Sequence, residues 1–117
     1  MKDMIKMHRE RLIELKSLIA LNIFVIDNMY KTHNSMIDDL TNSVGCADIR
    51  EFAEMDRGIL RSRLNIMPDN ERKSVLSKME NMIKIIYDIL KLKDETEKLQ
   101  EEAVIVDNVL KCLTHNG

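Results

Sequence analysis

The stretch LNIMPDNE, residues 64–71, contains the single proline of the 117-residue chain and decides how many helices the sequence forms. Apolar residues recur at helical spacing on both sides of Pro68. A proline inside a helix removes one backbone hydrogen bond and costs about 3 kcal/mol or more. Pro68 therefore either ends one helix or kinks a longer one, and the two outcomes give different folds.

The residues before this stretch predict one long helix and the start of a second. A heptad pattern of apolar residues runs through residues 3–42. The segment TNSVGCA (residues 41–47) ends the pattern, and Gly45 suits the left-handed cap that closes many helices. Asp48, followed by Glu51 three residues later, forms an acidic version of the capping box. The next helix is therefore expected to start at residue 48.

Beyond Pro68 the apolar pattern resumes as a stripe, which consists of Leu76, Met79, Ile83, Ile86 and Leu90. A stripe in another phase starts at Leu92, and Asp94 with Glu97 repeats the start signal of a helix. In one architecture Pro68 ends the second helix, and the helices have about 38, 19 and 44 residues. In the other architecture Pro68 only kinks the second helix, and the chain turns near residues 91–94.

We expect the second architecture, because helices of about 57, 66 and 30 Å can fold up, down and up into a rod. The predicted helices are 3–42, 48–92 and 94–113, in a single domain over residues 1–117. The expected fold class is all-α: an elongated, antiparallel, coiled-coil-like three-helix bundle whose second helix is kinked at Pro68.

Composition argues against several classes of partner. Charged residues make up 32% of the chain and aromatic residues 3%, and the formal net charge of -2 comes from interleaved signs. A chain without a basic block is not expected to bind nucleic acid. No apolar run reaches the roughly 18 residues of a membrane span, and the charged first residues do not resemble a signal peptide. We therefore expect no membrane partner, a cytoplasmic protein, and reduced thiols at Cys46 and Cys112.

The side chains that catalyse reactions or hold metals form no recognisable motif. None of His8, His33 and His115 has a second histidine one helical turn away or a glutamate three residues before it. His8 and His33 instead occupy the apolar seam of the first helix, where we expect them to be partly exposed. There is no glycine-rich phosphate loop and no nucleophile elbow. We expect no enzyme, no cofactor and no metal.

The most apolar stretch is LIALNIFVI, residues 18–26, with eight apolar residues in nine. Leu18, Leu21 and Val25 form a stripe beside the seam, and Phe24 lies next to it. One explanation is that the other two helices pack on different flanks of this helix. That explanation fits Leu21 and Phe24 poorly, because the heptad places both furthest outward. The alternative is a surface for a protein partner or a second copy, since burying two such side chains is worth roughly 3 to 6 kcal/mol.

Three short motifs resemble the family of tubulin-folding cofactor A, a small chaperone of β-tubulin. DIREFAE (residues 48–54) is similar to the family's D-I-K-K-Q-x-E at the start of its second helix. NIMPD (65–69) is similar to its M-M-I-P-D, and EEAVIVDNVLK (101–111) to its E-A-R-x-V-L-D-S-V-K. The order agrees over most of the chain. The spacing between the first two motifs is about one helical turn longer here, and the first helix lacks the family's dense Lys/Glu character.

The resemblance implies a non-enzymatic protein that captures monomeric β-tubulin along its helix faces. We therefore expect a chaperone of the tubulin folding pathway, in the cytoplasm and in contact with the cytoskeleton. The candidate partner-binding residues are Leu18, Leu21, Phe24 and Val25 with the motif positions Asp48, Arg50, Glu51 and Glu54, although these four charged residues also fit a simple solvated helix face. The alternative is a coiled-coil adaptor or an export chaperone for another protein client. A homodimer that pairs through the apolar stretch is a third option.

Overall fold

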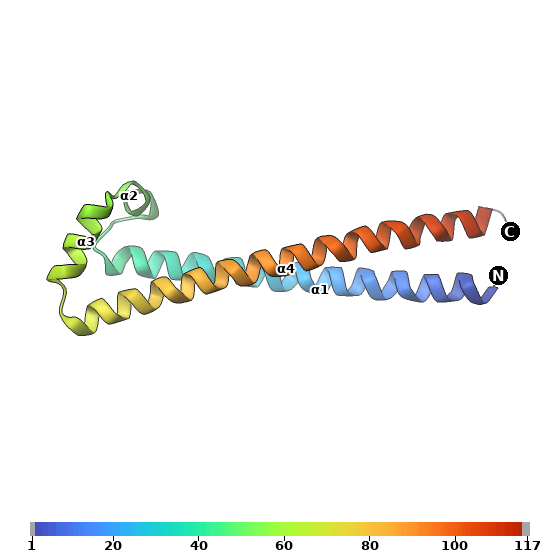
Figure 1. Cartoon of the computed structure of the whole chain (residues 1–117), viewed down its shortest axis with the longest axis horizontal. Coiled ribbons are helices and arrows are strands. Elements are labelled where there is room, and N and C mark those ends of the chain that lie inside the picture. Colours follow the sequence, from blue (N-terminus) through green and yellow to red (C-terminus); the bar gives the residue numbers. More distant parts are fainter. Residues whose placement is uncertain (1, 116–117) are drawn as a thin grey trace. The chain divides into compact units, whose positions relative to one another are not determined.

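The computed structural model describes residues 2–115, which form four α-helices (Figure 1). They are α1 (Lys2–Ser43), α2 (Ile49–Glu54), α3 (Arg57–Ile66) and α4 (Asp69–His115). No strand occurs within the described residues, so the prediction of an all-α protein is confirmed. The prediction of three helices is wrong. The chain has two helix breaks, at Met55 and at Pro68, where a continuous helix was predicted, and it has no turn near residues 91–94.

The end of α1 follows the prediction from Gly45. This glycine has a φ of 78°, in the left-handed region that side chains with a Cβ rarely adopt. The Gly45 N–H donates to the Asn42 carbonyl at 3.1 Å, and the Cys46 N–H donates to the Thr41 carbonyl at 3.0 Å. These two bonds are the Schellman arrangement, which satisfies carbonyls that have no partner within the helix. The end of α1 is therefore closed by hydrogen bonds between residues that are close in sequence.

The start of α2 also follows the prediction. Asp48 is the N-cap, and its carboxylate accepts from the Glu51 N–H at 2.9 Å. The Glu51 carboxylate accepts in turn from the Ala47 N–H at 2.9 Å. The two acidic side chains thus satisfy donors on both sides of the cap, as expected for a capping box.

A break between α2 and α3 was not predicted. Met55 has extended backbone angles and follows the last residue of α2, Glu54. Asp56 then caps α3 by accepting from the Gly58 N–H at 3.2 Å. The predicted continuous helix over 48–92 is therefore wrong already at Met55, because Asp56 offers the backbone a new N-cap.

Pro68 separates two helices and does not kink one. The preceding helix, α3, ends at Ile66, and Met67 is extended with φ -72° and ψ 146°. This conformation is the one that the ring of a following proline imposes on the residue before it. The kinked second helix is wrong, and the architecture in which Pro68 ends a helix is right at this position.

Arg72 explains why the break at Pro68 is stable. Its guanidinium donates to the carbonyls of Leu64 at 2.9 Å, Met67 at 3.1 Å and Asn65 at 3.2 Å. These carbonyls belong to the last turn of α3 and the residue after it, where the helix offers few N–H donors. The Leu64 carbonyl also accepts from the Met67 N–H at 3.3 Å. Arg72 also pairs with Asp69 at 3.3 Å. One side chain from α4 therefore caps the preceding helix.

The turn expected near residues 91–94 does not exist, and the helix predicted over 94–113 is the last part of α4. Asp94 forms an ion pair at 3.1 Å with Lys98, which lies one turn further along the same helix. The Thr96 hydroxyl donates to the Leu92 carbonyl at 2.7 Å, also within the helix. Without glycine or proline in this stretch, side chains that could have capped a new helix instead support a continuous one.

The chain divides into two compact units, which are described separately. Unit 1 comprises residues 2–28 and 89–115 of the described chain, and unit 2 comprises residues 29–88. Whether the chain is one domain in the folding sense stays a prediction.

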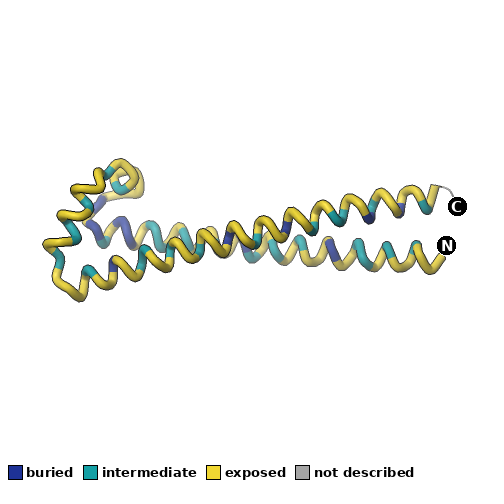
Figure 2. The backbone as a smooth tube through the Cα atoms, in the orientation of Figure 1, coloured by how far each residue is buried: buried dark blue, intermediate teal, exposed yellow. Residues whose placement is uncertain are grey.

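Unit 1 is an antiparallel pair of helices and not the predicted three-helix bundle. Arg11 of α1 contacts Glu102 of α4, whereas Ile26 and Thr96 line one hollow further along. The buried residues recur along each helix, as the blue positions in Figure 2 show. The core consists of Leu15, Val106 and Leu110, surrounded by Ile5, Leu12, Leu99 and Ala103. These residues are the seam positions that the heptad pattern predicts.

Unit 2 joins the end of α1 to α2, α3 and the start of α4. The core consists of Leu40, Val44, Cys46 and Val75, with Phe52, Met55, Leu60, Leu64, Met67, Met79 and Met82 packed around it. Lys78 ties α4 to α1 through Asp39 at 3.0 Å and Ser43 at 2.9 Å. Arg63 of α3 donates to the Val44 carbonyl at 2.9 Å, which fixes the turn after α1. Cys46 is buried here, Cys112 is exposed in unit 1, and both are free thiols.

Candidate protein-binding surface

The apolar stretch of the sequence lies on α1 within unit 1. Leu21 is 56% exposed and Phe24 is 64% exposed, while Leu18 is more than a third exposed and Val25 is half-buried. The prediction that Leu21 and Phe24 point outward is confirmed. Within unit 1 only α4 packs on α1, so the explanation that two other helices cover both flanks is wrong. We call Leu18, Leu21, Phe24 and Val25 the α1 apolar surface.

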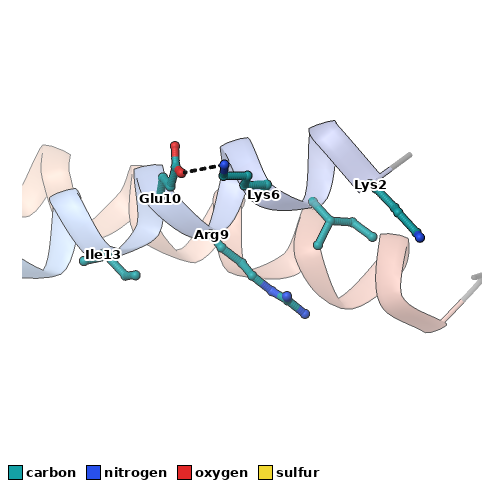
Figure 3. Close-up of a pocket in the computed structure, with 6 residues that line it drawn as sticks. Lys2, Lys6, Arg9, Glu10 and Ile13 are labelled. Carbon is teal, nitrogen blue, oxygen red and sulfur yellow. Dashed lines mark ion pairs between the residues drawn. The ribbon is translucent and has the colours of Figure 1, made fainter.

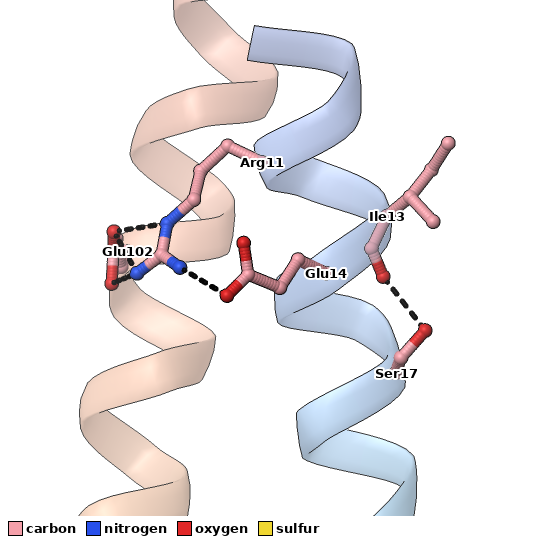
Figure 4. A network of polar contacts seen from close by, with 5 residues as sticks. All are labelled: Arg11, Ile13, Glu14, Ser17 and Glu102. Atoms are coloured by element: carbon pink, nitrogen blue, oxygen red, sulfur yellow. Dashed lines mark hydrogen bonds and ion pairs between the residues drawn. The ribbon is translucent and has the colours of Figure 1, made fainter. Parts of the chain in front are cut away.

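Ile13, which is not among the predicted residues, extends this exposed face toward the start of α1. Ile13 is 66% exposed. The hydroxyl of Ser17, one turn further, donates to the Ile13 carbonyl at 2.9 Å (Figure 4). The hydroxyl between Ile13 and Leu21 is thus bonded to the backbone and competes less for water. Residues 17–26 contain no charged side chain. The heptad count could have identified Ile13, since it occupies an outward position.

A charged contact beside this face holds the two helices of unit 1 together. Nε and Nη2 of Arg11 donate to the Glu102 carboxylate at 2.8 to 3.0 Å, and Nη1 pairs with Glu14 at 3.2 Å (Figure 4). The hydrogen bonds with Glu102 raise the pKa of Arg11 above its ordinary value. This bidentate contact between Arg11 and Glu102 fixes the orientation of α4 against α1 more strictly than a single hydrogen bond would.

The first turns of α1 carry a shallow hollow of about 370 Å³ with a basic rim. Its lining residues all belong to α1: Lys2, Ile5, Lys6, Arg9, Glu10 and Ile13 (Figure 3). Lys6 and Glu10 form an exposed ion pair at 4.0 Å. A hollow on the side of one helix leaves any occupant exposed to water. Ligand-binding and active sites usually bury most of the ligand, so this hollow does not have the shape of such a site.

The four charged candidates belong to unit 2 and have local partners. Asp48 and Glu51 form the capping contacts of α2. Arg50 and Glu54 form an exposed pair at 3.5 Å on the same short helix. Their assignment to a partner surface stays a prediction, because a cap and a solvated pair already account for these side chains.

Among residues 2–115 no group of three or more His, Cys, Asp or Glu side chains is arranged to hold a metal ion. None of the described helices combines the length and the hydropathy needed to cross a membrane.

His8 and His33 are half-buried, as predicted for seam residues. The Nε2 atom of His33 and the hydroxyl of Thr41 are buried without a hydrogen-bond partner in this part of the chain.

Comparison with family models, with characterised proteins and with solved structures finds no match to this chain. The fold and the exposed surface therefore define a class of protein only: a helical protein with an uncovered apolar face.

Proposed function

We propose that this chain is a non-enzymatic protein that binds another protein through the α1 apolar surface. The observation that carries the proposal is the exposure of Leu21 and Phe24 in a segment without charged residues. Isolated apolar side chains on a surface are ordinary, but a contiguous apolar face rimmed by charges is typical of an interaction site. Both side chains are already partly buried, so covering their exposed parts would contribute roughly 2 to 4 kcal/mol to binding.

We propose a chaperone role with β-tubulin as the favoured client, which places the protein in the cytoplasm. The support for this client is the resemblance of the three motifs to the tubulin-folding cofactor A family. The first motif coincides with the start of α2 and the second with the boundary at Pro68. The third lies inside α4, however, and the helix boundary expected before it is absent. A coiled-coil adaptor or an export chaperone with another client is the alternative role.

The test is capture of purified β-tubulin by the immobilised chain, with and without nucleotide. We expect capture that does not depend on nucleotide. The double variant Leu21→Lys with Phe24→Lys should bind roughly a hundredfold more weakly or worse, because its lysine charges would have to leave water. Circular dichroism should show unchanged helicity, since both positions are exposed.

Ile66→Lys is the matched control, because Ile66 is 84% exposed and belongs to α3. It introduces one lysine, half of the charge added by the double variant, outside the α1 apolar surface and should leave capture unchanged. If the wild-type chain fails to retain β-tubulin, the proposal that β-tubulin is the client is wrong. If the double variant captures as much β-tubulin as the wild type, the α1 apolar surface is not the binding site.

A further inference from the structure

One row of exposed side chains continues the α1 apolar surface from Phe24 to the start of α1. Its members follow one another at intervals of three or four residues, and this spacing places them on one side of an α-helix. All of them are exposed and belong to unit 1. The row, which we call the α1 row, consists of Lys2, Lys6, Arg9, Ile13, Ser17, Ala20 and Phe24.

The two halves of the α1 row differ in charge. Residues 2–16 contain five Lys and Arg against three Asp and Glu, whereas residues 17–26 contain no charged side chain. Lys6 pairs with Glu10 at 4.0 Å. Lys2 and Arg9 form no ion pair with another residue of the described chain. The charges of these two side chains are therefore available to a partner.

Ile13 connects the apolar half of the row to the basic half. Its exposed side chain lines the hollow of about 370 Å³ at the start of α1, and Lys2 and Arg9 line the same hollow (Figure 3). Arg9 lies one helical turn before Ile13. A partner segment that covers both Phe24 and Ile13 therefore brings its next turn against Arg9. Carboxylates at that end of the partner would be attracted, and ammonium groups would be repelled.

The other end of the row has the opposite charge. Asp27 follows Phe24 by three residues and is also exposed. A partner with carboxylates at one end would be repelled if that end lay beside Asp27, and attracted if it lay beside Arg9. Attraction at one end and repulsion at the other together favour one direction of docking.

We propose that the α1 row binds an amphipathic helix of the client whose apolar face is followed at one end by carboxylates, and that these carboxylates lie against Lys2 and Arg9. A helix fits because side chains spaced by three and four residues pack into the grooves of another helix. This inference rests on the proposed function, since it specifies the chemistry of the segment that the α1 apolar surface binds. It does not depend on β-tubulin being the client.

Two synthetic helical peptides test the proposal without the client. Both have the same apolar stripe and are long enough to cover the α1 row. One ends in a cluster of glutamates, and the other has lysines at those positions. By fluorescence anisotropy at low salt, the wild-type chain should bind the glutamate peptide about tenfold more tightly than the lysine peptide. This preference should decrease at high salt, because exposed charges are screened.

Charge reversal locates the preference. The variant Lys2→Glu with Arg9→Glu should bind the lysine peptide more tightly than the glutamate peptide. The matched control is Lys91→Glu with Arg61→Glu, which makes the same two changes at exposed positions outside the α1 row. It should keep the preference of the wild type. Circular dichroism should show unchanged helicity for both variants, since all four side chains are exposed.

The proposal is wrong if the wild-type chain binds both peptides equally or binds neither, or if the control loses the preference as fully as the Lys2→Glu, Arg9→Glu variant. It is also wrong if the chain alone forms a dimer that the Lys2→Glu, Arg9→Glu changes dissociate in sedimentation velocity, because a second copy would then occupy the row. Failure to capture β-tubulin would count against the named client and would leave the peptide result unchanged.

Discussion

Replacing Leu15 with alanine is expected to lower the free energy of unfolding by about 3 kcal/mol. Leu15 is fully buried at the centre of unit 1, in a cluster with Val106 and Leu110. The pair of helices has a core only one layer deep, so no second layer can move in to fill the cavity. Urea unfolding followed by circular dichroism, at one fixed protein concentration, measures the change.

Leu21→Ala is the matched control for Leu15→Ala. It is the same substitution on the same helix, but Leu21 is more than half exposed. We expect a change within about 0.5 kcal/mol, which is usual for surface positions. Equal losses for the two variants would contradict the assignment of Leu15 to the seam of unit 1.

Replacing Arg72 with alanine is expected to cost about 2 kcal/mol, because the carbonyls of Leu64, Asn65 and Met67 lose a charged donor. Part of the loss is recovered by water, since the Arg72 side chain is itself 36% exposed. The same unfolding measurement applies. Arg72→Lys should restore little stability, because a single ammonium cannot reproduce the forked geometry of a guanidinium.

Asp69→Asn separates the capping role of Arg72 from its ion pair. Asp69 is 82% exposed and its contact with Arg72 is 3.3 Å long. We expect a change of less than about 1 kcal/mol, as for other exposed ion pairs. A loss as large as that of Arg72→Ala would show that the ion pair, and not the cap of α3, accounts for the stability.

The parts of the fold that depend on neighbours in sequence could be predicted. Gly45 ends α1, and Asp48 with Glu51 starts α2, because each signal needs only atoms within a few residues. The seam of unit 1 could also be predicted, since a heptad pattern fixes which side of a helix is apolar. For the same reason the outward position of Leu21 and Phe24 was visible in the sequence.

The parts of the fold that depend on contacts between residues distant in sequence, or on competing local signals, could not be predicted from the sequence. Pro68 ends a helix with the help of Arg72, whose side chain reaches back across the boundary, and spacing rules do not include such a contact. Asp94 carries the same pattern as Asp48, but without a nearby glycine it remains inside α4. The contact between Arg11 and Glu102 joins residues 91 positions apart. Identifying that partner requires knowing that α4 does not turn back.

The separations between contacting residues set an order for folding. In unit 2 the chain closes 19 residues between Val44 and Arg63 and 35 between Ser43 and Lys78, against 91 between Arg11 and Glu102 in unit 1. Closing the longest of these loops first costs about 1 kcal/mol more in chain entropy than closing either shorter one. Once unit 2 has formed, the ends of unit 1 are joined through structured helices and no longer through a free chain. We expect α3 amides to gain protection from hydrogen exchange no later than the amides around Arg11 during refolding, and the reverse order would contradict this sequence of events.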